Sequence, residues 1–339
     1  MMRTETRKSF NDYKQNIASL NGIESVAEKF VIAPTIQQKL EERIQQSSEF
    51  LKRINIVGVD EQKGEKLGMD AANTIAGRTN TANADRVPSD ISALDANGYE
   101  CVQTNFDTAI KYAKLDAWAK FPNFQTMLRD VIVKRQALDR IMIGFNGTSA
   151  AADTDRTANP LLQDVNKGWV KHIRENAAER VMSEVVAASN KIKVGAAAGK
   201  DYENLDALVF DAANNLIHIT YQEDPRLVVI CGKGLMADKY FPIINQNQRP
   251  EDQLVMDMLI SQKRIGGLPG VQVPFFPANA FMITPLENLS LYWQIGARRR
   301  TILDNAKRDQ IENYESSNEA YVVEDYRAAC YVENIALSW

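Results

Sequence analysis

The residues with the most suggestive spacing for chemistry follow an apolar run at 227–231, which is typical of a buried strand. Gly232, Gly234 and Ala237 then have the G-x-G-x-x-A spacing, in which glycines let the backbone approach a pyrophosphate at a helix N-terminus. Pro242 would end that helix within a few residues, and no clear second parallel strand ending in an acid follows. The pattern favours a plain strand-to-helix turn, and a dinucleotide-binding enzyme is the alternative.

The histidines and the acidic pairs do not form a catalytic arrangement. His172 and His218 each lack a neighbouring Cys, Asp or His at a spacing that suits a metal site or a nucleophile pair. The acidic pairs at 223–224 and 324–325 are adjacent along the chain rather than facing each other, which is unsuited to sharing a proton. We therefore expect both histidines at or near the surface, and no catalytic residue, cofactor or metal.

A local basic cluster is formed by the arginines at 298–300 with Lys307 and Arg308. Such a cluster could contact phosphate or an acidic neighbour. Asp304 and Asp309 interleave with these cations, so the favoured interpretation is a solvated loop.

The composition is that of an ordinary, mildly acidic protein, with 45% hydrophobic residues, 25% charged residues and a net charge of -4. An overall basic footprint for nucleic acid is therefore missing. Cys101, Cys231 and Cys330 lie far apart, which predicts reduced thiols packed as small hydrophobes. The sequence contains no apolar run long enough for a membrane span and no apolar signal core, so we expect a protein made and kept in a cytoplasm, without a membrane partner.

The clearest structural element is a long helix over 123–145, which we expect to be a scaffold for the rest. Pro122 and Asn123 supply a start, and Gly144 and Gly147 supply a stop. Apolar residues recur within it at three- and four-residue steps, as in an amphipathic helix: Phe124, Met127, Leu128, Val131, Ile132, Leu138, Ile141, Met142 and Phe145.

Two segments before this helix are predicted to extend away from the main body of the protein. Residues 1–50 show helical spacing, but breaks at Gly22 and Pro34 divide them into pieces too short to hold a core. We expect an arm that needs a partner to pack against. Residues 53–112 begin and end with strand patterns and include a small, polar excursion at 73–88, which predicts an extended hairpin leading into the long helix.

The rest of the chain predicts a mixed α+β structure. We expect helices over 161–182 and 205–217, the first of them carrying Trp169. The strand candidates lie at 226–231, 271–273, 280–284, 289–293 and 320–332.

Several runs, spread in order over nearly the whole chain, carry a resemblance to a known family. They include Lys-Arg-Gln-Ala-Leu-Asp at 134–139, Tyr-Gln-Glu-Asp-Pro at 221–225 and Ala-Asp-Lys-Tyr-Phe-Pro at 237–242. Further runs lie at 47–57, 63–68, 144–147, 159–164, 260–266 and 313–316. Together they resemble the major capsid protein of tailed phages of the Peduoviridae type, the P-two group.

The resemblance implies the Hong Kong 97-type capsid fold, which is α+β with an N-terminal arm, an extended β-hairpin loop, a long spine helix and a mixed α/β axial domain. On this sequence it implies an arm at 1–50, a hairpin at 53–112, a peripheral domain at 113–203 with the spine helix at 123–145, an axial domain at 204–315, and a strand within 316–339 that returns to the peripheral domain.

The resemblance also implies a function. Copies would form the hexamers and pentamers of an icosahedral procapsid, together with an internal scaffolding and protease protein and a portal. The shell would then be trimmed, expand and enclose double-stranded phage DNA, which it would not bind sequence-specifically. The protein would be part of the virion after assembly in the host bacterial cytoplasm. A cellular cargo shell of the same fold is a further alternative.

Proteins similar to this family are cut near the end of the arm. Here the resemblance points to Phe30 and Val31, so that the first ~30 residues would be removed. This position lies between two helical pieces, where a protease could seat an extended strand.

The hairpin tip would contact a neighbouring subunit, through Asn73, Gly77, Arg78 and Asn80. Some members of the wider fold family join a hairpin lysine to an asparagine of a neighbour. Residues 73–88 contain no lysine, so we expect a shell held together without covalent cross-links.

Overall fold

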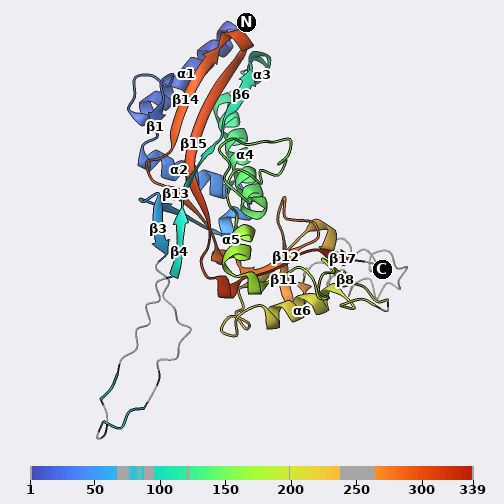
Figure 1. The fold of residues 1–339 in the computed structure, drawn as a ribbon. Helices are drawn as coiled ribbons and strands as arrows, with labels where there is room; N and C mark the ends of the chain where they lie inside the picture. Colours follow the sequence, from blue (N-terminus) through green and yellow to red (C-terminus); the bar gives the residue numbers. More distant parts are fainter. Residues whose placement is uncertain are drawn as a thin grey trace, which may run out of the picture.

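The computed structural model describes residues 2–66, 76, 78–81, 83, 85–87, 95–119, 121, 123–197, 199–236 and 264–337. These residues form a seven-stranded sheet, a six-stranded sheet and two two-stranded sheets. Figure 1 shows α1 and α3 beside one end of the long strands β14 and β15, and α6 with β11 and β12 at the other end of the molecule.

The seven-stranded sheet joins strands from distant parts of the sequence. Its central strand is β15, which pairs antiparallel with β14, β13, β5 and β6, while β1 pairs with β14 and β2 with β13. The strands are β1 (Phe30–Val31), β2 (Asn55–Val59), β5 (Val102–Asn105), β6 (Thr108–Lys111), β13 (Leu289–Gln294), β14 (Arg299–Asn305) and β15 (Gln310–Val323).

The six-stranded sheet has the order β10, β11, β9, β12, β16, β7. All residues of β9 and β12 are buried, as expected for strands covered on both faces. Helix α6 (Leu205–Asn215) packs its buried Leu208 and Val209 in the same core. The strands are β7 (Val181–Met182), β9 (Leu227–Cys231), β10 (Arg264–Ile265), β11 (Leu268–Gln272), β12 (Phe281–Pro285) and β16 (Cys330–Val332).

Two small sheets complete the strand pairing. One is the parallel pair β8 (Ile192–Val194) and β17 (Ile335–Leu337). The other is the antiparallel pair β3 (Lys63–Lys66) and β4 (Asp95–Glu100). The extended hairpin predicted over 53–112 is therefore only partly a hairpin: β3 and β4 form its base, whereas β2, β5 and β6 belong to the seven-stranded sheet.

The long helix predicted over 123–145 is confirmed as α4 (Phe124–Asn146). Its buried side chains include Leu128, Ile141 and Phe145, but Val131 is 56% exposed and does not belong to the buried stripe. The other helices are α1 (Thr4–Asn21), α2 (Pro34–Gln46), α3 (Tyr112–Trp118) and α5 (Trp169–Asn176).

The N-terminal segment packs on its own chain, which corrects the expectation of an arm without an intramolecular partner. In α1, Phe10 is 3% exposed and shares a hydrophobic cluster with Leu115, Leu128, Ile302 and Ile311. The sequence pattern missed this contact because the residues that complete the core come from α3, α4, β14 and β15, which are far away along the chain.

The helix predicted over 161–182 is wrong at its start and its end. The α-helix covers only Trp169–Asn176, and Ala178–Arg180 forms a separate 3-10 turn. Leu162 has a positive φ of 58°, which a helix does not tolerate. After the helix, Ala177 has a φ of -148°, which lies outside the helical range.

The strand predicted over 320–332 is also two strands. β15 ends at Val323, and a 3-10 turn (Tyr326–Ala328) follows, in which the side chain of Asp325 accepts a hydrogen bond from the Arg327 amide. The turn directs Cys330–Val332 into the other sheet as β16.

The boundary expected at 315/316 does not match the sheets. β13 and β14 lie within 204–315 but belong to the seven-stranded sheet, whereas β16 lies within 316–339 and belongs to the six-stranded sheet.

Helices α4 and α5 approach closely at Gly144, beside an aromatic cluster. Trp169 is fully buried, and its ring lies 5.1 Å from Phe145 and 5.4 Å from Tyr321 between centroids. Its indole N–H donates to the carbonyl of Ser290 at 2.9 Å. A Cβ at Gly144 would lie 2.2 Å from the Trp169 ring. Only glycine fits between α4 and this fixed indole.

We expect Gly144→Ala to destabilise the chain by about 2 kcal/mol. Alanine gains up to ~1 kcal/mol in helix propensity, but forcing a methyl group into a filled core costs about 1–3 kcal/mol, and the upper end applies where the neighbour is fixed. Urea unfolding measures the difference. Gly234→Ala is the matched control, because its nearest atom would be 3.5 Å away; it should change stability by less than about 1 kcal/mol. Equal stability of Gly144→Ala and the wild type would contradict the packing argument.

Candidate assembly site

The glycine turn after β9 is filled by the protein's own backbone. The Gly232 amide donates to the Ala280 carbonyl at 3.1 Å, and a Cβ at Gly232 would lie 2.3 Å from the carbonyl oxygen of Ala278. A carbonyl oxygen repels phosphate, so a pyrophosphate is not accommodated here. β9 also lies between parallel β11 and antiparallel β12, unlike a dinucleotide-binding sheet. The dinucleotide-binding interpretation is not supported, and Ala237 lies outside the described residues.

The three cysteines are confirmed as buried thiols, and none of them forms a disulfide. Burial raises the pKa of the thiols of Cys101 and Cys330 to about 12. The thiolate is the reactive form, so these groups are packing residues.

The histidines lie apart from each other. His218 Nδ1 lies 3.0 Å from the hydroxyl of Thr220, and His172 lines a cleft described below. Of the acidic pairs, Asp224 binds Arg226 and Asp325 binds Arg327, each through an ion pair. Within the described residues, no group of three or more His, Cys, Asp and Glu side chains is arranged to hold a metal ion.

The arginines at 298–300 are not a solvated loop. Arg298 is fully buried, and Arg300 donates to Asn313 at 2.6 Å and to the hydroxyl of Tyr13 at 3.1 Å. Arg299 is exposed. The expectation was wrong because a run of charges is usually a surface feature, whereas here the carboxylates that hold Arg298 come from other elements.

A buried charge cluster surrounds Arg298 and Arg140. Arg140 of α4 contacts Glu41 of α2 at 2.6 Å and Glu319 of β15 at 2.6 Å. Arg298, just before β14, binds the same Glu41 and also Glu315 of β15, the latter at 2.6 Å. All five side chains are 4% exposed or less. Glu41 therefore joins the two arginines and ties α2 to α4 and β15.

Two side-chain amides lie in and beside this cluster. Gln136 of α4 accepts from Arg298 at 2.8 Å and donates to Glu315 at 3.2 Å. Gln37, one turn before Glu41 on α2, donates to the carbonyl of Gln294 at 3.0 Å and accepts from the Gly296 amide at 2.9 Å. Buried ions need such hydrogen-bond partners to be tolerated.

The arginines favour the charged form of two carboxylates of the cluster, Glu41 and Glu315. Burial by itself would raise the pKa of Glu41, but Arg140 and Arg298 outweigh it and the pKa is lowered. For Glu315, burial is likewise outweighed by Arg298 and Arg300, and its pKa is lowered. A lowered folded-state pKa contributes stability above the ordinary value of 4.5, and this contribution is lost as the pH falls through the folded-state pKa.

Sequence reasoning missed the cluster, although a signal was present. Arg140 occupies a position of the apolar stripe of α4, beside Ala137 and Ile141, which are both buried. Glu319 alternates with Tyr321 and Val323, so it points to the same side of β15 as these core residues. A charge at a core position of a helix or strand demands a buried partner.

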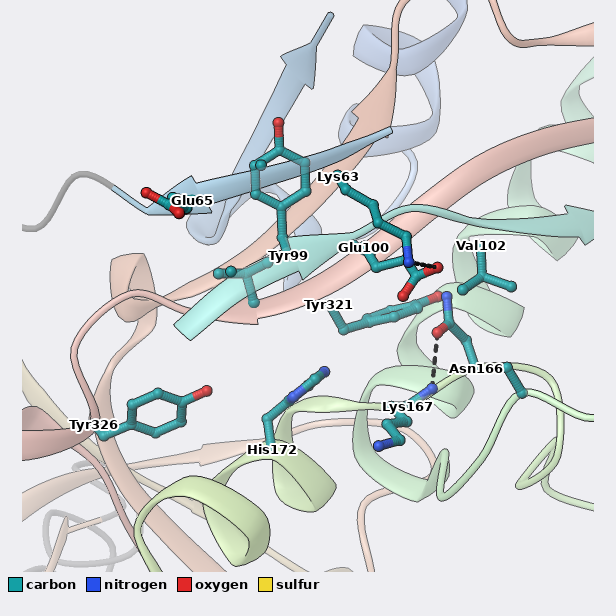
Figure 2. A pocket seen from close by; sticks show the side chains of 15 residues that line it. Lys63, Glu65, Tyr99, Glu100, Val102, Asn166, Lys167, His172, Tyr321 and Tyr326 are labelled. Atoms are coloured by element: carbon teal, nitrogen blue, oxygen red, sulfur yellow. Dashed lines mark hydrogen bonds and ion pairs between the residues drawn. The ribbon is translucent and has the colours of Figure 1, made fainter. Parts of the chain in front are cut away.

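A cleft of about 820 Å³ lies between the hairpin base, α5 and the end of β15. Figure 2 shows Tyr99 and Glu100 of β4 on one side and His172, Lys167 and Tyr321 on the other. Both lysines of the lining form ion pairs: Lys63 contacts Glu100 at 2.8 Å, and Lys167 contacts Glu175 at 3.0 Å. The hydroxyl of Tyr321 is buried and has no hydrogen-bond partner among the described residues. This lining offers polar contacts at the base of the hairpin.

The segment expected to be cut is an edge strand. Phe30 and Val31 form β1, which lies between α1 and α2 and pairs with Arg300 and Arg299 of β14. Phe30 is 9% exposed and Val31 50% exposed. Of the expected tip residues, Arg78 and Asn80 are exposed, and Asn73 and Gly77 lie outside the described residues.

Arg140→Leu should destabilise the chain by about 3–5 kcal/mol, because it leaves Glu41 and Glu319 with fewer buried partners. Arg135→Leu on the same helix is the matched control. Arg135 pairs with Asp139, and its side chain is 54% exposed, so its loss should cost less than about 1 kcal/mol. Chemical denaturation of both variants measures the difference. An equal loss of unfolding free energy in both variants would contradict the argument that the buried cluster stabilises the chain.

The chain matches a known protein family over most of its length. Residues 9–335 match the family described as "Phage major capsid protein, P2 family". The chain is 53% identical to the "Capsid proteins" of Escherichia phage P2, over 98% of this chain and 95% of that protein. It is 39% identical to the "Major capsid protein" of Serratia phage KSP20, over 99% of this chain and 98% of that protein.

Solved structures agree with the sequence matches. A chain of the satellite phage P4 procapsid, solved with its size determination (Sid) protein, is 51% identical and has a TM-score of 0.83 over 99% of both chains. A chain of the empty GTA particle capsid is 13% identical with a TM-score of 0.50 over 86% of this chain, which supports the fold alone. The fold is the Hong Kong 97-type capsid fold, as the resemblance implied. Neither the dinucleotide-binding enzyme nor the cellular cargo shell gains support. This chain belongs to the P2 family of phage major capsid proteins.

Proposed function

We propose that copies of this chain assemble with an internal scaffolding and protease protein into an icosahedral procapsid, which is then trimmed, expands and encloses double-stranded DNA. The observation that carries the proposal is the match to a procapsid chain over 99% of both chains, with a TM-score of 0.83. The shell would contain hexamers and pentamers and a portal. It would assemble in the cytoplasm of the host bacterium and would hold DNA without reading its sequence. Consistent with this, the net charge of -4 offers no overall basic surface.

The arrangement of the sheets suggests how a copy would sit in the shell. We assign the seven-stranded sheet with α4 to the peripheral domain and the six-stranded sheet with α6 to the axial domain. The exposed Val131 of α4 and Phe210 of α6, at 56% and 63%, would then be available to neighbouring copies. Apolar side chains that stay exposed in a single copy are candidates for such contacts.

The hairpin would contact a neighbouring copy through non-covalent interactions. Its base is held by the pairing of β3 with β4 and by the Lys63–Glu100 ion pair. The tip, which we assign to Asn73, Gly77, Arg78 and Asn80, would reach over a neighbouring copy. No lysine lies at 73–88, so the tip has no amine for a bond to an asparagine.

Negative-stain electron microscopy of the chain co-expressed with its scaffolding and protease gene tests the assembly. Closed isometric shells are expected. The matched control replaces residues 73–88 by a flexible linker of the same length, which should leave a folded chain that forms few or no shells. If co-expression with several versions of the scaffolding protein gives only monomers or dimers of the wild-type chain, the proposed assembly is wrong.

Intact-mass spectrometry of mature particles should find a chain that lacks about the first 30 residues, because the arm ends between two helices at an edge strand. Procapsids made with an inactivated protease should keep the complete arm. Denaturing electrophoresis of the same mature particles should show one band and no ladder of higher mass. Retention of Met1 or Met2 on every mature copy would exclude the trimming, and a ladder would exclude the non-covalent shell.

A further inference from the structure

The segment around the expected cut is held closed by backbone pairing. Phe30 and Val31 pair with β14, and the Ile32 amide donates to the Arg298 carbonyl at 2.9 Å. The Ile302 amide of β14 donates to the Val26 carbonyl at 2.9 Å. A protease binds its substrate as an extended strand and must reach both the backbone and the side chains around the bond. In this structure one hydrogen-bonding edge of the segment is already paired with β14.

The side chains of the segment alternate between buried and exposed. Phe30 is 9% exposed and Ile32 is 3% exposed, while Val31 between them is 50% exposed. Val26 is also buried, at 4%. A protease pocket that receives Phe30 or Ile32 therefore requires these side chains to leave the hydrophobic cluster first.

Helix α1 holds this segment down on the same surface. Phe10 of α1 lies in one cluster with Phe30 and Ile302. Polar contacts surround that cluster: Arg7 pairs with Asp304 at 3.3 Å, and the hydroxyl of Tyr13 accepts from Arg300.

Further contacts tie the two ends of α1 to the chain. The backbone amide of Arg3 donates to the Asp116 carboxylate at 3.1 Å, and the side-chain amide of Asn16 donates to the side chain of Gln125 at 3.0 Å. At the end of α1, Asn21 accepts from the Ala33 amide at 3.3 Å, on the far side of β1. The arm and the segment to be cut thus form one docked unit, and Figure 1 shows α1 and β1 along the outer edge of β14.

We infer that this docked arm protects its own cutting site: α1 must detach from α3, α4 and β14 before a protease can cut near Phe30 and Val31. The inference deepens the proposed trimming and rests on it for its biological meaning. Cutting would follow a local opening of the arm, so its rate tracks the population of the open state while the rest of the chain stays folded. Trimming would then be confined to copies whose arms have been released, for example by contacts with the scaffold.

Limited digestion of the purified chain with chymotrypsin tests the protection without the phage protease, because this enzyme cuts after aromatic residues such as Phe30. Phe10→Ala removes the central side chain of the docked helix, so we expect cutting after Phe30 to accelerate at least about tenfold. Leu20→Ala is the matched control on the same helix. Leu20 is 67% exposed, and its loss should change the rate by less than about twofold.

Hydrogen exchange in the same samples separates local opening from general unfolding. In Phe10→Ala, the Ile32 and Ile302 amides should exchange faster, while those of β9 should keep the wild-type rate. Equal cutting after Phe30 in the wild type, Phe10→Ala and Leu20→Ala would overturn the inference. The inference would also be overturned if cutting after Phe30 accelerated in Phe10→Ala and the β9 amides exchanged faster in the same variant. If the protection is found but mature particles keep the complete arm, the proposed trimming is wrong while the closed state of the arm stands.

Discussion

A cluster of buried charges fixes how the main elements of this subunit meet. Its members are Glu41, Arg140, Glu315, Arg298 and Glu319. They connect the second helix of the arm, the long helix and the central strand of the larger sheet in one place. Apolar side chains of similar volume would often stabilise a core equally well. A charge network differs because its hydrogen bonds are satisfied in one alignment of the elements only.

The consequence of this constraint is a firmly connected core to which the arm is attached by fewer contacts. The cluster holds α2 against α4 and β15. The aromatic group around Trp169 holds α5 against the same helix α4. The arm before α2 is attached differently, by one hydrophobic cluster and by polar contacts such as that of Arg7 with Asp304. The side chains of Arg7 and Asp304 are both partly exposed. A subunit built in this way can release its arm without losing its core.

The sequence predicted the elements whose signal is local. The spacing of apolar residues indicated α4 nearly to the residue, and alternation or apolar runs indicated strands that became β9, β12 and β13. It failed where the decisive partner is remote. The docking of Phe10, the burial of Arg298 and the change of sheet between Val323 and Cys330 all depend on residues far away along the chain, which no single-sequence period reports. The glycine turn shows the opposite error, a local pattern that suggested a site which the fold does not form. The motif matches, but the carbonyl of Ala278 fills the space that a pyrophosphate would need.

The family assignment and the geometry together describe a shell subunit whose core is set by buried charges and whose arm and hairpin are peripheral. The most direct test is a reconstruction of mature particles by cryo-electron microscopy. The account predicts an icosahedral shell in which α4, β14 and β15 of each copy superpose on this structure, with Glu41 between Arg140 and Arg298. A particle whose shell density cannot be fitted by this chain, or in which these elements are rearranged, would contradict it.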